Sequence, residues 1–386
     1  MSDGTRAVLA ERLIPRQVRR VPRRPRDVLL LNWRDLTNPE GGGSELYVEN
    51  VAARLAATGD RVTIFCAAHR NAPGDEVKNG VRYVRRGNHH TVFAWAAVLL
   101  LLGRIGRQGE IIEVHNGMPF LARVWARRPV TVLVHHVHRE QWSVVLGRVG
   151  AAVGWWLEGW LAPRINRRCR YVAVSEATKA ELVGLGVAAE HVTVVHNGTP
   201  PVLPTAAERS PQPTIAVLGR AVPHKRVELV LDAVAELRHQ VPGLRLEVAG
   251  DGYWLPALRE KVAALGLGDV VVLHGWVTEQ QKADLLARAW VHAVPSLKEG
   301  WGLSVVEAGS HGTPSVAFRA AGGLTESVLD GRTGLLVDDV SSLREALRLL
   351  LTDRTLRERL GEGARAHAGR YTWAGTAASF STLLDA

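Results

Sequence analysis

Two carboxylates and several glycines form the chemically most informative segment of the sequence. Glu299 lies in a glycine-rich loop after an apolar stretch, and Glu307 follows in a predicted helix with seven residues between the two. A carboxylate accepts paired hydrogen bonds from sugar hydroxyls. The amides of Gly302, Leu303 and Ser304 at the helix start suit a phosphate. The helix dipole alone favours a carboxylate such as Glu307, but it does not explain the glycines beside Glu299.

A second cluster supplies positive charge. Arg220 ends a predicted strand, and Lys225 comes just before the next predicted helix. Two cations at a strand end suit a diphosphate, although surface charge on a loop would explain this cluster if it stood alone.

A third loop, which contains Gly42 and Gly43, precedes a predicted helix. Glycines there let the backbone approach a ligand, and a helix start attracts an anion. A purely structural role is equally open. The G-x-G-x-x-G spacing of a dinucleotide site is missing, which disfavours an oxidoreductase.

The elements that must position these residues alternate between strand and helix. Apolar runs at residues 28–31, 62–66, 81–84, 111–114, 131–134, 171–174 and 192–195 predict strands of a first domain. Residues 199–213 hold five prolines and predict a linker. The alternation restarts at residue 214 and ends with predicted helices at 341–361 and 371–384. We expect an α/β protein of two doubly wound, Rossmann-like domains, with ligands in the cleft between them.

Nine short motifs in this order resemble those of family 4 glycosyltransferases, which have the GT-B fold. The match extends from residue 27 to the C-terminus. The motifs are GGSE at 42–45, VSEAT at 174–178, HNG at 196–198, GR at 219–220 with Lys225, AGDG at 249–252, the two glutamates at 299 and 307, GTP at 312–314, GGLTE at 322–326 and DGRTGLLV at 330–337.

The resemblance implies a retaining enzyme that transfers a sugar from a nucleotide donor to a hydroxyl acceptor. Arg220 and Lys225 would bind the donor diphosphate, Glu307 the ribose and Glu299 the donor sugar. Gly42 or Gly43 would approach the phosphate from the other domain when the domains close. Fixed cations would stabilise the leaving diphosphate without a metal, and the chain contains no D-x-D pair.

The resemblance also implies an active-site histidine after the strand at 131–134. His135 matches it, but the segment continues with His136 and His138, and His138 is the competing assignment. Three neighbouring histidines could suggest zinc, yet a cysteine or carboxylate at ligand spacing is missing. We therefore expect no metal and no cofactor other than the donor, a UDP-, GDP- or ADP-sugar.

The net charge of +10 is concentrated in two segments. Residues 1–26 carry eight arginines against two acidic residues, and residues 139–170 carry six against two. The rest is neutral, which argues against a basic coat for nucleic acid. Apolar residues in the second segment recur every three or four positions, as on one helix face: Trp142, Val145, Val149, Val153, Trp156 and Trp160. This face either packs on the first sheet or, with its arginines, lies at a membrane surface.

The predicted domains are a basic, disordered tail at residues 1–26, an acceptor domain at 27–198, the linker, a donor domain at 214–370 and a helix at 371–386 that returns to the acceptor domain. Two cysteines and no long apolar segment predict a cytoplasmic enzyme. We expect it to dock peripherally on the inner face of an anionic membrane and to use an acceptor that is lipid-borne, a polysaccharide or a natural product. The alternatives are a nucleotide-sugar epimerase of GT-B fold and a non-enzymatic basic protein that binds membrane surfaces.

Overall fold

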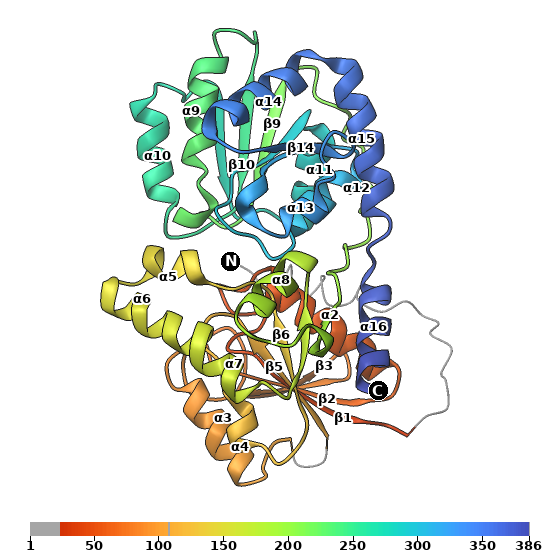
Figure 1. The fold of residues 1–386 in the computed structure, drawn as a ribbon. Coiled ribbons are helices and arrows are strands. Elements are labelled where there is room, and N and C mark those ends of the chain that lie inside the picture. The colour runs from red at the N-terminus through yellow and green to blue at the C-terminus, as the bar shows by residue number, and fades with distance from the viewer. Residues whose placement is uncertain (1–23, 107–108, 386) are drawn as a thin grey trace. The chain divides into compact units, whose positions relative to one another are not determined.

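The computed structural model describes residues 24–106 and 109–385 (Figure 1). It divides into two compact units, one comprising the chain up to Gly198 together with Trp373 onward, and the other Thr199–Thr372. Residues 1–23 of the predicted basic tail lie outside the described residues. The tail prediction is wrong at its end, because Arg26 forms ion pairs of 2.8 Å with both Asp60 and Asp385 and so belongs to the folded first unit.

The first unit is built on an eight-stranded sheet with the order β3-β4-β2-β1-β5-β6-β7-β8. All neighbours are parallel except β3 and β4. The strands are β1 (Asp27–Leu31), β2 (Arg61–Cys66), β3 (Asp75–Lys78), β4 (Val81–Arg85), β5 (Glu110–His115), β6 (Val130–Val134), β7 (Arg170–Ala173) and β8 (Val192–Val194). Central strands such as β1 (DVLLL) and β6 (VTVLV) are mostly apolar, as expected for parallel strands whose two faces are both covered by helices.

The helices of the first unit include α2 (Gly43–Ala57), α3 (Val92–Leu101), α4 (Ala122–Trp125), α8 (Glu176–Gly184) and α16 (Trp373–Asp385). The last of these packs against α2, as Figure 1 shows, with the Tyr47 ring 6.0 Å from that of Trp373 and 6.1 Å from that of Phe380.

The tryptophan-rich segment does not form the single helix that the spacing predicts. It divides into α5 (Arg139–Val145) and α6 (Arg148–Trp155), and α6 continues through a π-helical turn (Trp156–Leu161) into α7 (Ala162–Ile165). The break falls at Leu146 and Gly147, whose extended backbones cannot continue a helix. Trp142 therefore lies on a different helix from Trp156 and Trp160.

The second unit has a six-stranded sheet with the order β11-β10-β9-β12-β13-β14, and every pair is parallel. Its strands are β9 (Thr214–Leu218), β10 (Arg245–Ala249), β11 (Val271–Gly275), β12 (Val291–Val294), β13 (Ser315–Phe318) and β14 (Gly334–Val337). Its helices are α9 (Glu228–Leu237), α10 (Leu255–Ala264), α11 (Glu279–Arg288), α12 (Leu303–Ser310), α13 (Leu324–Ser327), α14 (Val340–Thr352) and α15 (Arg354–Ala368).

The second unit differs from the sequence prediction in its last helices, and it also holds the proline-rich segment. The single helix predicted at 341–361 is wrong, because α14 ends at Thr352 and Asp353 caps a new helix by accepting a hydrogen bond of 2.9 Å from the Leu356 amide. The proline-rich segment at 199–213 is held on this unit by side-chain hydrogen bonds. Thr205 bonds to Asp284, and Trp290 Nε1 donates to the carbonyl of Ser210 at 2.7 Å.

Candidate active site

In the second unit, two loops at the carboxyl ends of β9 and β12 are joined by hydrogen bonds. The Leu297 amide donates to the carbonyl of His224 at 2.8 Å. The Arg226 guanidinium donates to the carbonyls of Pro295 and Ser296 at 2.8 and 3.1 Å, and it lies 4.5 Å from the centre of the Phe318 ring. Arg226 thus joins the two loops, and its neighbour Lys225 lies close to the loop that carries Glu299.

Glu299 lies at the centre of this arrangement. Its Oε1 forms an ion pair with Lys225 Nζ and accepts a hydrogen bond of 2.7 Å from Ser296 Oγ. Burial raises the pKa of Glu299, but the Lys225 charge and the hydrogen bonds from Lys225 and Ser296 together outweigh burial and hold the pKa below its usual value, so the carboxylate is ionised. The structure therefore brings together two residues that the sequence predicts for the site.

The backbone on either side of Glu299 is tied to the GGLTE motif. The Glu299 amide donates to the carbonyl of Ala321 at 2.9 Å, and the Gly323 amide donates to the carbonyl of Glu299 at 3.0 Å. A β-carbon on Gly323 would lie 2.0 Å from the carbonyl oxygen of Gly300, so only glycine permits this approach. The loop carrying Glu299 is thus fixed by backbone contacts.

Arg220 lies in the same loop as Lys225, directly after β9. Gly219, before it, has a φ of +156°, and a β-carbon on Gly250 would lie 1.8 Å from the Gly219 carbonyl oxygen. The Ala221 amide also donates to the carbonyl of Asp251 at 3.0 Å. The AGDG motif therefore supports the loop that carries both predicted diphosphate ligands.

Helix α12 begins directly after the Glu299 loop, and Gly302 precedes it with a left-handed φ of +89°. A β-carbon there would lie 2.5 Å from Leu324 Cδ2, which explains the glycine in steric terms. Leu303 and Ser304 form the first turn, as predicted, and Glu307 lies in the second. One carboxylate oxygen of Glu307 is already engaged, because Oε1 forms an ion pair of 2.6 Å with Lys282 of α11.

In the first unit, the predicted glycine loop leads into α2. Gly42 has extended backbone, and its amide donates to Glu45 Oε2 at 2.7 Å, while Gly43 is the first helical residue. Glu45 is fully buried, and its Oε1 forms an ion pair of 3.0 Å with Arg34 and accepts from Ser44 Oγ at 2.8 Å. Burial opposes ionisation of Glu45, but Arg34 and these hydrogen bonds hold its pKa below the usual value.

His135 and His138 have different environments at the end of β6. His135 is 6% exposed, its ring packs edge-on against Tyr47 at 5.3 Å, and its Nε2 has no partner among the described residues. Burial lowers the pKa of His135 to about 4, so the ring is neutral at physiological pH. An unpaired buried ring nitrogen is a group that a bound ligand could satisfy.

His138 is held by a carboxylate that the sequence analysis did not identify. Its Nδ1 lies 2.8 Å from Glu158 Oε1, and its backbone amide donates to the same carboxylate at 3.1 Å. Trp142 Nε1 donates to Glu158 Oε2 at 2.7 Å. The other ring nitrogen of His138 lies 3.3 Å from Asn116 Oδ1, and the Asn116 amide donates to Ser44 Oγ at 3.0 Å. A hydrogen-bonded chain thus links Glu158 to the GGSE motif.

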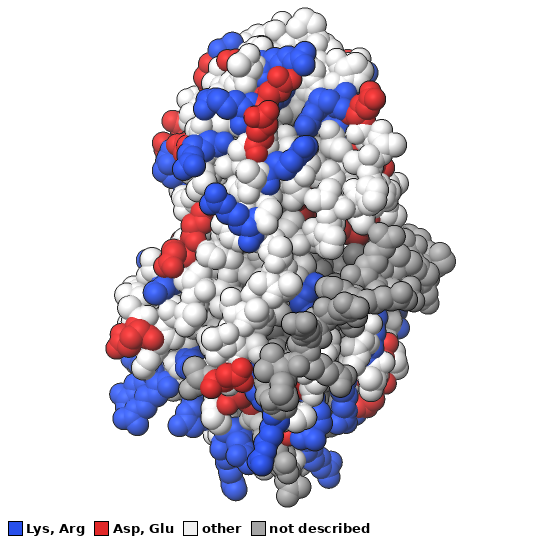
Figure 2. Space-filling model, turned by 90° about the vertical axis from the view of Figure 1, so that its right-hand side faces the viewer, with Lys and Arg blue, Asp and Glu red and all other residues white. Residues whose placement is uncertain are grey.

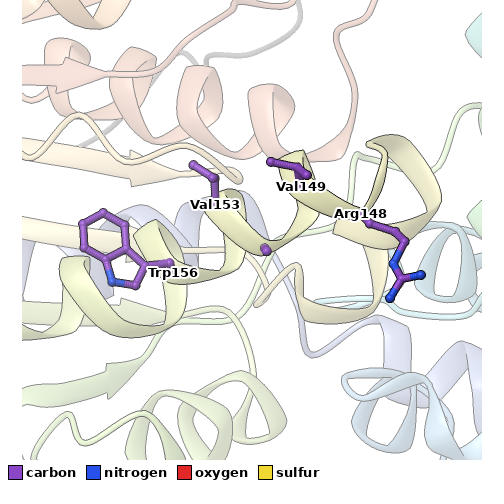
Figure 3. Close-up of a pocket in the computed structure, with 5 residues that line it drawn as sticks. Arg148, Val149, Val153 and Trp156 are labelled. Atoms are coloured by element: carbon purple, nitrogen blue, oxygen red, sulfur yellow. The ribbon is translucent and has the colours of Figure 1, made fainter.

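The face of α6 is exposed rather than packed on the sheet. The exposed fractions of Val149, Val153, Trp156 and Trp160 are 80%, 52%, 49% and 45%. Figure 3 shows the side chains of Val149, Val153 and Trp156 beside Arg148, around a shallow hollow of about 410 Å³. Of the two interpretations of the tryptophan face, packing on the sheet is wrong for these residues.

Residues 24–106 and 109–385 contain no group of three His, Cys, Asp or Glu side chains arranged to hold a metal ion. Within the same ranges, each helix is too short or too polar to cross a membrane.

Comparison with known families matches both halves of the chain. Residues 41–202 match the family described as Glycosyltransferase Family 4, and residues 204–367 match Glycosyl transferases group 1. A D-inositol 3-phosphate glycosyltransferase of Streptomyces bingchenggensis is 31% identical over 94% of this chain and 90% of its own length. One of the same name from Streptomyces avermitilis is 32% identical over 94% and 87%. These matches do not support the epimerase or the non-enzymatic protein.

Solved structures agree at the level of the fold. Sucrose-phosphate synthase from Thermosynechococcus elongatus has a TM-score of 0.77 at 21% identity, covering 93% of this chain and 98% of that one. Anabaena HepE in complex with UDP-glucose has a TM-score of 0.72 at 19% identity, with 93% and 99% covered. WaaG, a glycosyltransferase involved in lipopolysaccharide biosynthesis, has 0.73 at 17%, with 92% and 99% covered.

Proposed function

The chain belongs to the family 4 glycosyltransferases and has the GT-B fold, and we propose that it transfers a sugar from a UDP-, GDP- or ADP-sugar to a hydroxyl acceptor with retention of configuration. In this proposal Arg220, Lys225 and the first amides of α12 bind the donor diphosphate. Glu307 binds the ribose, and Glu299 orients the transferred sugar. His135, through its unpaired Nε2, and Gly42 and Gly43 contribute to donor binding in the same proposal.

The observation that carries this proposal is the Lys225–Glu299 pair with Ser296. Breaking the bond between sugar and diphosphate places negative charge on the leaving group and positive charge on the anomeric carbon. A fixed ammonium beside a fixed carboxylate matches this separation of charge without having to rearrange. The proton released by the acceptor hydroxyl passes to the leaving phosphate, so the reaction balances without a further base. We propose that no metal takes part.

A donor panel tests this proposal. UDP-, GDP- and ADP-sugars are scored for binding and for slow hydrolysis by the wild type and by Arg220→Ala and Lys225→Ala. We expect each variant to lose turnover by at least about a hundredfold, since removing a donor to a developing anion has that effect. Lys261→Ala is the matched control, because Lys261 forms a similar ion pair with Asp232 on the surface of the same unit. Near-normal rates in Arg220→Ala or Lys225→Ala would refute the phosphate roles.

The names of the relatives suggest which acceptor to test first. Those reported above are named for D-inositol 3-phosphate, which makes that compound the first acceptor to test, followed by lipid-linked sugars, polysaccharides and natural products. Transfer to any of these without formation of an epimer is the expected result. An epimerised nucleotide sugar would contradict the proposal.

We also propose that the first unit docks on an anionic membrane through the apolar face of α6 and its π-helical turn. Trp156 and Trp160 stack at 5.6 Å, and the Arg164 guanidinium lies 4.2 Å from the Trp160 ring centre. Soluble proteins seldom expose contiguous apolar surface of this kind, and tryptophan next to arginine suits the boundary between headgroups and acyl chains. Both cysteines are free thiols, which fits the reducing, inner side of a cell membrane.

Helix α3 offers a second apolar surface in the same unit. Its sequence from Val92 to Leu101 contains no charged residue, yet Trp95 is 44% exposed and Leu101 is 61% exposed. Exposed arginines follow it, at Arg104 and at Arg123 of α4. Figure 2 shows one face of the molecule, on which Lys and Arg side chains are exposed in several groups. Charge and apolar surface therefore occur together in this unit.

Flotation with vesicles separates these contributions. We expect the wild type to float with vesicles that contain phosphatidylglycerol and not with pure phosphatidylcholine. The double variant Trp156→Ser/Trp160→Ser should reduce the floated fraction severalfold, whereas Val77→Ser, on an exposed edge strand of the same unit, should not. A chain lacking residues 1–23 tests the basic tail while retaining the Arg26 ion pairs. Unchanged flotation of the double variant would refute docking through this face.

A further inference from the structure

Lys282 is a partly buried charged residue to which the proposed reaction assigns no role. It lies on α11, one turn after the helix start, where Thr278 and Gln281 cap the helix by bonding to each other's backbone. Its Nζ forms ion pairs of 2.6 Å with Glu307 Oε1 and of 2.7 Å with Glu279 Oε2, and its side chain is only 16% exposed. An ammonium group has three protons, and these two ion pairs account for two of them.

The cluster contains two carboxylates and one ammonium, all provided by neighbouring helices. The pKa of Glu307 lies above its usual value, because burial and the Glu279 charge raise it by more than Lys282 lowers it. Lys282 therefore favours the carboxylate form of Glu307. It also fixes the orientation of the side chain, because Glu307 Oε1 is tied to a second helix that is capped in place. Two vicinal hydroxyls are recognised well by an ionised carboxylate and less well by a neutral acid, which has lost part of its acceptor capacity.

We infer that Lys282 is a positioning residue for ribose recognition, which holds the Glu307 side chain through their ion pair and orients it toward the 2′- and 3′-hydroxyls of the donor nucleotide. The inference rests on the proposed role of Glu307. It predicts that discrimination between ribose and deoxyribose depends on two helices, with the acceptor group on α12 and its partner on α11. Glu279 shares the ammonium, so its removal leaves Lys282 bound to Glu307 alone.

The test compares binding of UDP, GDP and ADP with binding of their 2′-deoxy and 3′-deoxy forms by calorimetry. For the diphosphate that binds best, we expect the wild type to prefer ribose by about tenfold or more, the worth of a hydrogen bond to a charged group. Lys282→Met should bring this ratio close to one, while Lys282→Arg should restore most of it. Glu279→Gln should leave the ratio unchanged or increase it. Lys261→Met is the control for loss of an ion pair in the same unit.

The outcomes separate the inference from the proposed function. If Glu307→Gln abolishes the preference for ribose and Lys282→Met does not, the positioning role is wrong and the ribose role of Glu307 stands. If Glu307→Gln keeps the preference, both are wrong. If none of the three diphosphates binds, the donor assignment falls and the inference falls with it. Thermal melts of each variant show whether the unit is folded, and a folded Lys282→Arg that fails to restore the ratio also contradicts the inference.

Discussion

Replacing Glu158 by glutamine should loosen one segment of the first unit and leave the rest folded. The carboxylate is 5% exposed and accepts hydrogen bonds from the His138 amide, the His138 ring and the Trp142 indole. Glutamine has nearly the same shape, but one of its two oxygens is replaced by an NH₂ group that faces these donors. Hydrogen bonds to a charged group contribute about 1.5–3 kcal/mol each, and an unpaired buried donor costs a similar amount.

We therefore expect the free energy of local opening of residues 136–161 to fall by about 3 kcal/mol, which is roughly a hundredfold in the opening equilibrium. Hydrogen exchange measured on peptides by mass spectrometry follows this segment directly. Peptides from the second unit provide an internal reference, since they should not change. Glu140→Gln is the matched control, because Glu140 is exposed on the first turn of α5.

A companion variant tests the mechanism. Trp142→Phe removes one donor but leaves the Glu158 carboxylate with its two His138 contacts, so its effect should be smaller. In the double variant Glu158→Gln/Trp142→Phe, the new NH₂ group no longer faces the indole N–H. The combined fall in the free energy of local opening should therefore be smaller than the sum of the two single falls. Exchange in Glu158→Gln within about threefold of wild type, or equal to that in Glu140→Gln, would refute the role assigned to these hydrogen bonds.

Three further predictions concern other parts of the fold. Burial raises the pKa of Glu49 from 4.5 to about 7. Between pH 4.5 and 7, the Glu49 carboxyl is therefore protonated in the folded state and ionised in the unfolded state, so the free energy of unfolding falls as the pH rises. Glu49→Gln should match wild type near pH 4.5 and exceed it by ~3 kcal/mol above pH 7.5; a pH-independent difference in denaturant unfolding would contradict this. Gly323→Ala should weaken nucleotide binding at least tenfold, because the added β-carbon would displace the Gly300 carbonyl. Gly268→Ala is the control, since a β-carbon there meets nothing within 4 Å. Equal nucleotide affinities of the two variants in titrations would count against the proposed loop geometry. Asp353→Ala should cost about 1 kcal/mol by uncapping α15, seen as a lower melting temperature, and an unchanged melt would show that the cap contributes nothing.

The strands and the family motifs could be predicted because they depend on local pattern. β1 and β9 are short apolar runs, and glycine motifs mark the turns after them. β3 escapes prediction because its sequence, DEVK, is a polar edge strand without an apolar face. The break between α5 and α6 was also missed, since the apolar spacing continues across Gly147 as though the helix did.

Partners that pair across the fold are harder to infer than motifs. Glu158 meets His138 twenty positions earlier only because a π-helical turn directs its side chain inward while Trp156 and Trp160 remain exposed. Lys282 meets Glu307 because α11 and α12 are neighbours, and nothing in either helix sequence specifies the other. The sequence predicts the candidate site residues, whereas Lys282 and Glu158, which pair with Glu307 and His138, are found only through three-dimensional packing.

The return of α16 to the first unit makes the second unit an insertion within the first. The chain leaves after Gly198 and comes back at Trp373. The two crossings are adjacent, because the Thr199 amide donates to the Tyr371 carbonyl at 3.1 Å and Thr199 pairs with Thr372. Residues 199–372 are therefore one continuous segment with neighbouring ends, suited to independent synthesis and folding. The first unit, in contrast, combines two segments separated in sequence, and it is complete only after α16 has been synthesised.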